Sequence, residues 1–171
     1  MFDRLVRAIR LDPTLYREVA GNKDLMGEAA LIVLVATLLS AIGAGAGSHR
    51  AFLAFGAELI NGLLIGWLLW SVLALLIGDF LGGRSELSEM VRTLGYANAP
   101  RFLAVFGFLP CVGWLFRLAA WILTIAAGVI AIRESMEFDT LKAVVTAVLG
   151  LLAYIVISGL VGLVFGGLAL R

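Results

Sequence analysis

The stretch AALIVLVATLLSAIGAGAG, residues 29–47, decides the fold, because it carries no charged side chain and is about as long as a membrane-spanning helix must be. A helix satisfies its backbone N–H and C=O groups internally, as the lipid interior requires. Comparable stretches fill most of the chain after residue 29. Hydrophobic residues make up 62% of the sequence, and the mean hydropathy is +1.06. The sequence therefore predicts an all-α protein whose main solvent is lipid.

Five membrane spans are predicted, at residues 29–47, 59–78, 98–109, 112–132 and 141–170. The third is short and ends at Pro110, in a PCVG turn that favours a tight helical hairpin. It either crosses with help from the preceding ELSEMVRTLGYANA stretch, residues 86–99, or it is re-entrant. The predicted fold class is a polytopic transmembrane helical bundle of about five spans, with short interfacial helices on the cytoplasmic side.

The distribution of Lys and Arg orients this bundle. One set of span ends carries most of the cations: Arg4, Arg7, Arg10, Arg17, Lys23, Arg84, Arg92, Arg101, Arg133 and Lys142. The opposite side receives Arg50 and Arg171, with Arg117 nearby. The positive-inside rule then predicts a cytoplasmic amino terminus and an outer carboxyl terminus. A four-span topology would weaken this bias.

Residues 1–28 are predicted to form a cytoplasmic amphipathic segment, and residues 29–171 the transmembrane domain. Phe2, Leu5 and Ile9 follow helical spacing, and arginines on the other faces would lie near anionic headgroups. Asp12 then caps a second short helix that starts at Pro13 and ends at Gly21. A third surface helix is expected after Ser85 as its cap, with Leu87, Met90, Val91 and Leu94 on its apolar face and Gly95 at its end.

The sequence offers little chemistry for catalysis. It has one histidine, His49, and one cysteine, Cys111, so a Cys/His metal cluster is excluded. A serine nucleophile would need a base held close by, and His49 has no obvious partner. Glu134, Glu137 and Asp139 cluster before the last span. A solvated turn with Asp139 or Thr140 as helix cap is favoured there over a weak cation site. We expect no enzyme activity, no cofactor and no metal.

The predicted spans contain two features to consider: a polar face, and glycines spaced for close helix packing. Glu58 and Asn61 form one polar face that points along a helix toward Gly62 and Gly66, as a polar path or as an interhelical hydrogen bond. Gly-x-x-x-Gly spacing predicts close helix packing, within one chain or between chains. It occurs at Gly43 and Gly47, Gly62 and Gly66, Gly78 and Gly82, and Gly162 and Gly166.

Two short motifs precede the first and third spans. These are Asp24-Leu25-Met26-Gly27 and Leu94-Gly95-Tyr96-Ala97-Asn98-Ala99-Pro100. With them the chain resembles the Yip1 family, whose members carry an Asp-Leu-aromatic-Gly-Pro motif and a Gly-Tyr-x-x-x-Pro motif at these places. The FLPCVGWL turn, residues 108–115, matches the bacterial branch. Met26 and Glu28 depart from the first motif, so its family positions here are Asp24, Leu25 and Gly27. In the second motif they are Gly95, Tyr96 and Pro100.

The resemblance implies a five-span membrane protein with a cytoplasmic amino terminus. The short segment before the first span argues against the GTPase binding of eukaryotic members. We therefore expect a non-enzymatic scaffold in the plasma membrane of a prokaryote that organises lipids or partner membrane proteins, with no nucleic acid among its partners and homo-oligomers left open. The alternative is a small transporter or channel subunit with a polar path near Glu58 and Asn61. A membrane-embedded hydrolase would need a second histidine or an acid pair.

Overall fold

The computed structural model describes residues 1–46, 51–109 and 111–169, and every regular element in these ranges is helical. The α-helices are α1 (Phe2–Ile9), α2 (Pro13–Gly21), α3 (Met26–Ala46), α4 (Ala51–Ile60), α5 (Trp70–Phe80), α6 (Leu87–Tyr96), α7 (Gly113–Ser135) and α8 (Thr140–Ala169). Two 3₁₀-helices, η1 (Lys23–Leu25) and η3 (Ala99–Phe108), and one π-helix, η2 (Asn61–Leu69), complete the order. The predicted all-α fold is confirmed.

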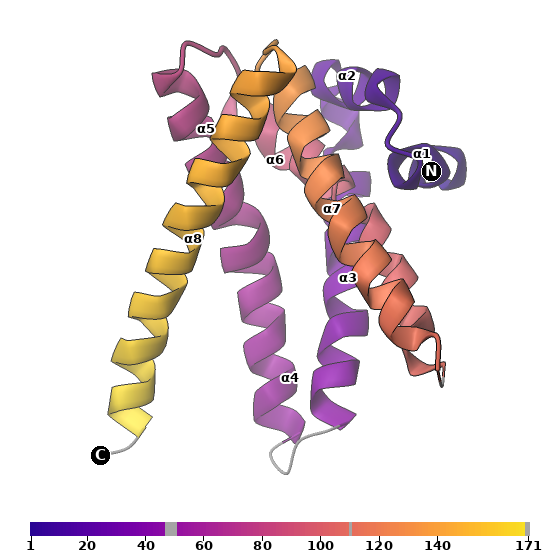
Figure 1. Cartoon of the computed structure of the whole chain (residues 1–171), viewed down its shortest axis with the longest axis vertical. Helices are drawn as coiled ribbons and strands as arrows, with labels where there is room; N and C mark the ends of the chain where they lie inside the picture. The colour runs from indigo at the N-terminus through magenta and orange to yellow at the C-terminus, as the bar shows by residue number, and fades with distance from the viewer. Residues whose placement is uncertain (47–50, 110, 170–171) are drawn as a thin grey trace.

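Four helical segments among the described residues are long and apolar enough to cross a membrane: Lys23–Ala41, Phe55–Phe80, Gly113–Ser135 and Thr140–Ile157. They correspond to the first, second, fourth and fifth predicted spans, and Figure 1 shows them as the long helices of the bundle. Large apolar side chains on their outer faces are exposed, among them Trp121 at 63%, Leu152 at 55% and Ile155 at 56%. Such a surface suits lipid and not water, which confirms a polytopic transmembrane bundle.

The third predicted span is a composite. Its 3₁₀-helix η3 rises about 2.0 Å per residue and so covers about 20 Å, less than a hydrocarbon core. It packs along α7, and the two form the arms of a hairpin (Figure 1). Helix α6 precedes it and reaches into the bundle, since Nε1 of Trp67, within the second span, donates to the Val91 carbonyl oxygen at 2.8 Å. Together α6 and η3 lead the chain to the hairpin turn.

Helix α6 is more deeply buried than a helix that only lies on the membrane surface. Its buried residues are Met90, Arg92, Thr93, Leu94, Gly95 and Tyr96, and it contacts α2, α3, α5 and α7. The prediction that Ser85 caps it is wrong. Glu86 occupies the cap position without a side-chain bond, while Oγ of Ser85 lies 2.7 Å from Oγ of Ser135.

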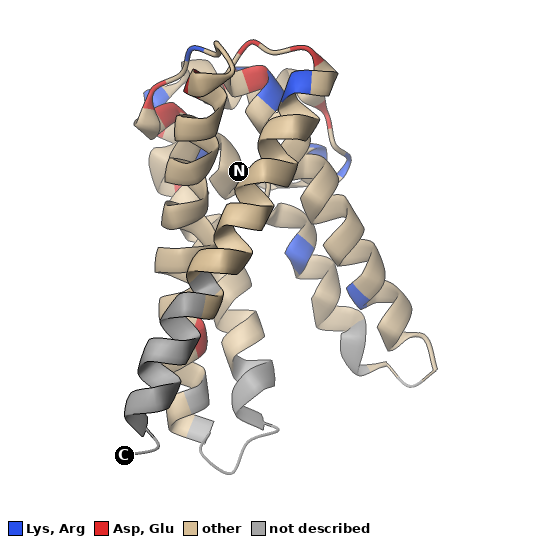
Figure 2. Cartoon of the chain, turned by 60° about the vertical axis from the view of Figure 1, so that its left-hand side comes forward, with Lys and Arg blue, Asp and Glu red and all other residues tan. Residues whose placement is uncertain are grey.

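Most charged side chains gather at one end of the bundle (Figure 2). We call this the charged end: it comprises α1, α2, the loop between α5 and α6, and the turn between α7 and α8. Both predicted short helices are present, and the predicted cap of the second is correct. Oδ1 of Asp12 accepts the Thr14 backbone N–H at 2.9 Å, Pro13 opens α2, and the helix ends at Gly21. Helix α1 leaves Phe2 79% exposed.

The glycines of the Gly-x-x-x-Gly pairs differ in their surroundings. A Cβ added to Gly62 would lie 2.4 Å from Cγ2 of Thr37, so α3 and η2 are in close contact there. Gly78 faces Met136 in the same way, with 2.4 Å to Cε, whereas Gly82 has φ +86 and open space and is a turn glycine. The nearest atom to Gly66 is the Asn61 carbonyl oxygen of its own helix. Gly43, Gly47, Gly162 and Gly166 lie outside the residues whose surroundings are described.

The contact between Gly62 and Thr37 yields the first prediction. Gly62→Ala should destabilise the protein by about 1–3 kcal/mol, because the β-branched Thr37 side chain cannot rotate away cheaply. The measurement is the thermal unfolding midpoint in detergent. Gly128→Ala is the matched control, because a Cβ there meets nothing within 4 Å. Adding Thr37→Ala to Gly62→Ala should restore the midpoint. A single Gly62→Ala variant as stable as wild type would contradict the close contact.

Candidate functional site

The two motifs singled out in the sequence meet at the charged end. A Cβ added to Gly95 would lie 2.8 Å from Cβ of Ala29, so α6 and α3 approach each other closely at this point. One residue further on, the Tyr96 hydroxyl donates to Oε2 of Glu28 at 2.6 Å. Gly95 was expected to end α6, but the helix includes it and ends at Tyr96. Its role is to admit the neighbouring helix.

Glu28 also binds α1. Nε and Nη2 of Arg4 donate to its two carboxylate oxygens at 3.1 and 2.6 Å, and the terminal amine lies 3.9 Å away. This carboxylate therefore joins α1, α3 and α6. Burial, and the neighbouring Glu28 carboxylate, raise the pKa of Tyr96, so its hydroxyl stays a proton donor. The hydrogen bond to Glu28 also raises the pKa of Arg4, the positive partner of the cluster.

The remaining motif residues are Asp24, Leu25, Gly27 and Pro100. The Asp24 backbone N–H donates to Oδ1 of Asn22 at 3.0 Å, which starts η1. Leu25 is 5% exposed and belongs to the apolar core at the charged end. Pro100 is buried in the first turn of η3, where its missing N–H costs nothing. Nothing in the structure explains Gly27, which is exposed with open space around it.

Arg92 is a structural centre that the sequence analysis counted only as a topology charge. It is 2% exposed and has the largest fully buried side chain among the residues whose burial is described. Its Nε donates to the Val19 carbonyl oxygen at 2.6 Å, and Nη2 donates to that of Ala20. Both carbonyls belong to the last turn of α2, where backbone oxygens lack i+4 partners within the helix and the helix dipole is negative. The Val19 oxygen also accepts the Asn22 N–H at 3.4 Å. Arg92 therefore caps α2 from α6 and fixes it to the bundle.

A second polar cluster lies between α2 and α7. Nε and Nη2 of Arg17 donate to Oε2 of Glu134 at 3.0 and 2.8 Å, and Arg133 donates to Oε1 from Nε at 3.0 Å and also from Nη2. The Glu134 side chain is only 5% exposed. The predicted solvated turn is therefore wrong for Glu134, and correct for Asp139, whose Oδ1 caps α8 through the Lys142 N–H at 2.9 Å.

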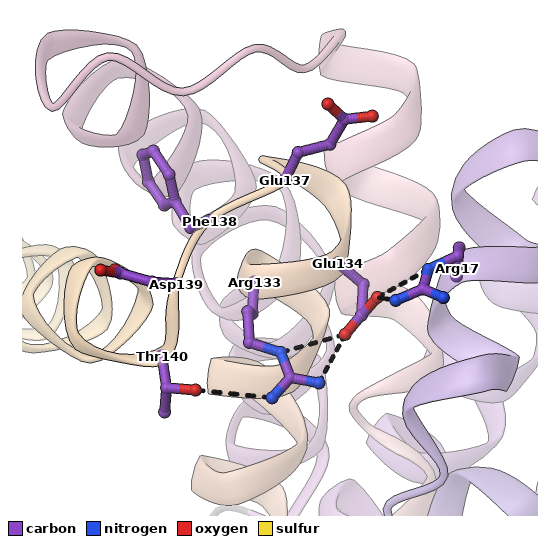
Figure 3. A pocket seen from close by; sticks show the side chains of 7 residues that line it. All are labelled: Arg17, Arg133, Glu134, Glu137, Phe138, Asp139 and Thr140. Atoms are coloured by element: carbon purple, nitrogen blue, oxygen red, sulfur yellow. Dashed lines mark hydrogen bonds and ion pairs between the residues drawn. The ribbon is translucent and has the colours of Figure 1, made fainter.

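This cluster and the turn between α7 and α8 line an open cavity of about 570 Å³. Figure 3 shows Glu134 between the two arginines, with Glu137, Phe138 and Asp139 following along the turn. Among the described residues no group of three or more His, Cys, Asp or Glu side chains is arranged to hold a metal ion. Glu137 and Asp139 point away from the two arginines (Figure 3), and both are exposed.

The polar face predicted at Glu58 and Asn61 is only partly assembled. Asn61 is exposed. Glu58 lies one turn before Gly62 in the second span, and because Gly62 packs on Thr37, the antiparallel register puts Glu58 at the depth of Ser40. Nη2 of Arg101 donates to Oγ of Ser40 at 3.1 Å, and Nη1 to Oδ1 of Asn98 at 3.2 Å. Arg101 also interacts electrostatically with Glu58. The sequence analysis missed Arg101 as a member of this group.

The arginines of α1 are mostly engaged within the protein. Arg4 binds Glu28, and Arg7 binds Asp12 at 2.8 Å and Glu18 at 3.0 Å. Hydrogen bonds from Thr14 and then from Arg7 lower the pKa of Asp12 to about 2. Arg10 is exposed and makes no such bond in the described structure. Lipid headgroups therefore meet fewer free cations on α1 than the sequence suggested.

These features define a polytopic helical membrane protein with a charged layer clamped to one end of its spans. Comparison with protein families then identifies it further: the Yip1 domain model matches residues 11–165, nearly the whole chain. The chain belongs to the Yip1 domain family. Comparisons with curated proteins and with solved structures gave no match.

The bond between Tyr96 and Glu28 yields the second prediction. Tyr96→Phe keeps the buried ring but removes the donor, and should cost about 2 kcal/mol, as for a hydrogen bond to a charged group. Tyr96→Ala should cost more and also alter the oligomer size in detergent. The control is Tyr154→Phe, because the Tyr154 hydroxyl makes no hydrogen bond among the described residues. Equal thermal midpoints for Tyr96→Phe and wild type would refute the role of this bond.

The clamp formed by Arg92 yields the third prediction. Arg92→Gln should release α2, and trypsin should then cleave after Arg17 and Lys23 about tenfold faster or more. Arg92→Lys should be cleaved nearly as fast as Arg92→Gln, because an ammonium lacks the guanidinium fork that reaches two carbonyls. Arg84→Gln removes an exposed arginine at the same end and serves as control. Unchanged cleavage in Arg92→Gln would show that α2 is held without Arg92, by its apolar contacts and the Arg17–Glu134 pair.

Proposed function

We propose that this member of the Yip1 family is a non-enzymatic membrane scaffold that organises lipids or partner membrane proteins at its charged end. The observation that carries the proposal is the Arg92 clamp. A buried arginine that caps α2 makes the charged layer a rigid extension of the spans, where a flexible tail would have sufficed for anchoring. A rigid layer can present a fixed surface to a partner, and preorganisation reduces the entropic cost of binding.

The charged end is proposed to face the cytoplasm of a prokaryote, with the carboxyl terminus outside the plasma membrane. Support comes from the cations exposed at this end, which are Arg10, Arg17, Lys23, Arg84 and Lys142. Cytoplasmic loops carry such an excess of Lys and Arg. The apolar outer faces of α7 and α8 leave room for lipid, for partner membrane proteins or for a second copy of the chain.

Cross-linking in intact membranes tests the scaffold proposal. A photoreactive residue at Lys23, whose side chain is 80% exposed at the charged end, should give discrete adducts with partner proteins or lipid headgroups. The same probe at Leu152, on the apolar face of α8, should give acyl-chain adducts. Combining the Lys23 probe with Arg92→Gln should remove the discrete adducts, because the presenting surface is lost. Adducts that are absent at Lys23, or that persist in Arg92→Gln, would contradict a rigid scaffold.

A transporter or channel subunit is the second candidate. The observation in its favour is the intramembrane group of Ser40, Glu58 and Arg101, because ionisable side chains inside a membrane mark functional paths more often than structural ones. Liposome flux separates the two functions. For a scaffold, reconstituted protein should not move ions or small solutes. Solute flux that Glu58→Gln abolishes would establish the conduit and overturn the scaffold.

A further inference from the structure

A polar side chain lies on the outside of the second span. Asn61 is exposed, and its amide makes no hydrogen bond among the described residues. It lies within the apolar segment Phe55–Phe80, about 9 Å of helix from the nearer end of that segment. Its side chain is too short to reach the headgroups over that distance, as a lysine or an arginine could. An unpaired amide in hydrocarbon is costly, so a partner from outside the chain would stabilise it.

Asn61 belongs to a stripe of exposed residues along the second span. These residues recur at intervals of three or four, as on one face of a helix. We call the stripe the Asn61 face, and it comprises Leu53, Ala57, Ile60, Asn61, Leu64 and Leu68. Ala57, one turn before Asn61, is small and lets a second helix approach closely. The π-helix η2 begins at Asn61, and π-helical turns are frequent at functional sites.

The chemistry of the Asn61 face suits a copy of itself. Glu58 is the only ionisable residue from 51 to 78, and it is half-buried and interacts electrostatically with Arg101. The face itself therefore carries no charge. An amide is both donor and acceptor, so two asparagines related by a two-fold axis can satisfy each other. A different membrane protein would need a matching polar group at the same depth, which a second copy has by symmetry.

The exposed face of α7 is less suited to such pairing. Arg117 is exposed on it, between Trp114 and Trp121. Two copies that met through this face would bring like charges together in a medium of low dielectric constant, which is costly. The charge distribution therefore favours the Asn61 face.

We propose that the Asn61 face binds a second copy of this chain within the membrane, in a two-fold symmetric dimer. The two Asn61 side chains exchange hydrogen bonds across the axis, and the leucines on either side pack around them. A single asparagine has the same role in the seam of a two-stranded coiled coil. The interface lies on the spans and not at the charged end, so it goes beyond the scaffold proposal.

Cysteine cross-linking in native membranes tests where the two copies meet. Cys111 is the only cysteine in the sequence, so Cys111→Ser provides a full-length background without thiols. In this background Leu64→Cys should form a disulfide-linked dimer on mild oxidation, because the two positions face each other one turn from Asn61. Leu152→Cys is the matched control, since Leu152 on α8 is equally exposed, at 55%. It should stay monomeric.

Substitution of Asn61 tests what holds the dimer together. Asn61→Leu should raise the dissociation constant in mild detergent about tenfold, as expected for the loss of an interhelical hydrogen bond. Asn61→Gln keeps an amide and should retain most of the affinity. Analytical ultracentrifugation measures both. The thermal midpoint of the monomer should not fall in Asn61→Leu, because Asn61 makes no hydrogen bond within the described part of its own chain.

Four results would overturn the inference. The first is a wild type that is monomeric in detergent, together with no dimer from Leu64→Cys in membranes. The second is a dimer of unchanged affinity in Asn61→Leu, since another face would then hold the copies together. The third is equal cross-linking of Leu152→Cys. The fourth is an adduct of Leu64→Cys with a different protein, which would show that a foreign partner covers the face. The scaffold proposal is judged separately, by the adducts at Lys23.

Discussion

The structure depends on one buried guanidinium. Arg92 lies inside the helix bundle at 2% exposure and remains tolerable there because the end of α2 offers carbonyl oxygens that no intrahelical donor can reach. The carbonyl oxygens accept the hydrogen bonds of the buried cation, and the cation offsets the negative end of the helix dipole. Because α6 itself packs on α2, α3, α5 and α7, this contact ties α2 to the bundle, beside the pairs of Arg17 with Glu134 and of Arg4 with Glu28. The contacts of Gly95 with Ala29 and of Tyr96 with Glu28 also depend on the place of α6 in the bundle.

Lipid as solvent explains where the polar chemistry lies. Along the spans, outward side chains such as Trp121 and Leu152 are apolar and exposed, so polar contacts there are few and directed inward, as between Arg101 and Ser40. At the charged end the same chain uses ion pairs freely, with Arg4 on Glu28 and Arg17 on Glu134. Surface pairs in water contribute little to stability, but pairs partly screened from water by apolar neighbours contribute more. The charged end is therefore where the chain can recognise polar groups and still be rigid.

Much of the fold could be predicted from residue order, because its signals are local. Apolar run length identified the spans, and Asp12 before Pro13 identified the start of α2. The third span was harder to predict, because it is not one long α-helix like the others. The buried helix α6 and the 3₁₀-helix η3 follow one another there instead. The contacts of Arg92 with Val19, of Glu28 with Tyr96 and of Glu134 with Arg17 were not predictable, because they join residues 73, 68 and 117 positions apart. One signal was present: Arg92 is the only charge in a run of apolar and small polar residues from 90 to 97, which is unusual for a surface helix.

The departure of this chain from the family motif has a structural counterpart. A proline and a glutamate are both compatible with the first turn of a helix, the proline because it needs no donor and the glutamate because its charge faces the positive end. Only the glutamate, however, can accept hydrogen bonds. At position 28 it binds the motif residue Tyr96 and the α1 residue Arg4 with the same carboxylate. A proline at this position would leave both donors to find other partners, so α1 would lose its link to the motif. The ion pair between α1 and the motif junction therefore depends on this substitution, whereas Ala8 of α1 is buried in the apolar core whatever residue stands at position 28. The junction itself is already formed by the close contact of Gly95 with Ala29.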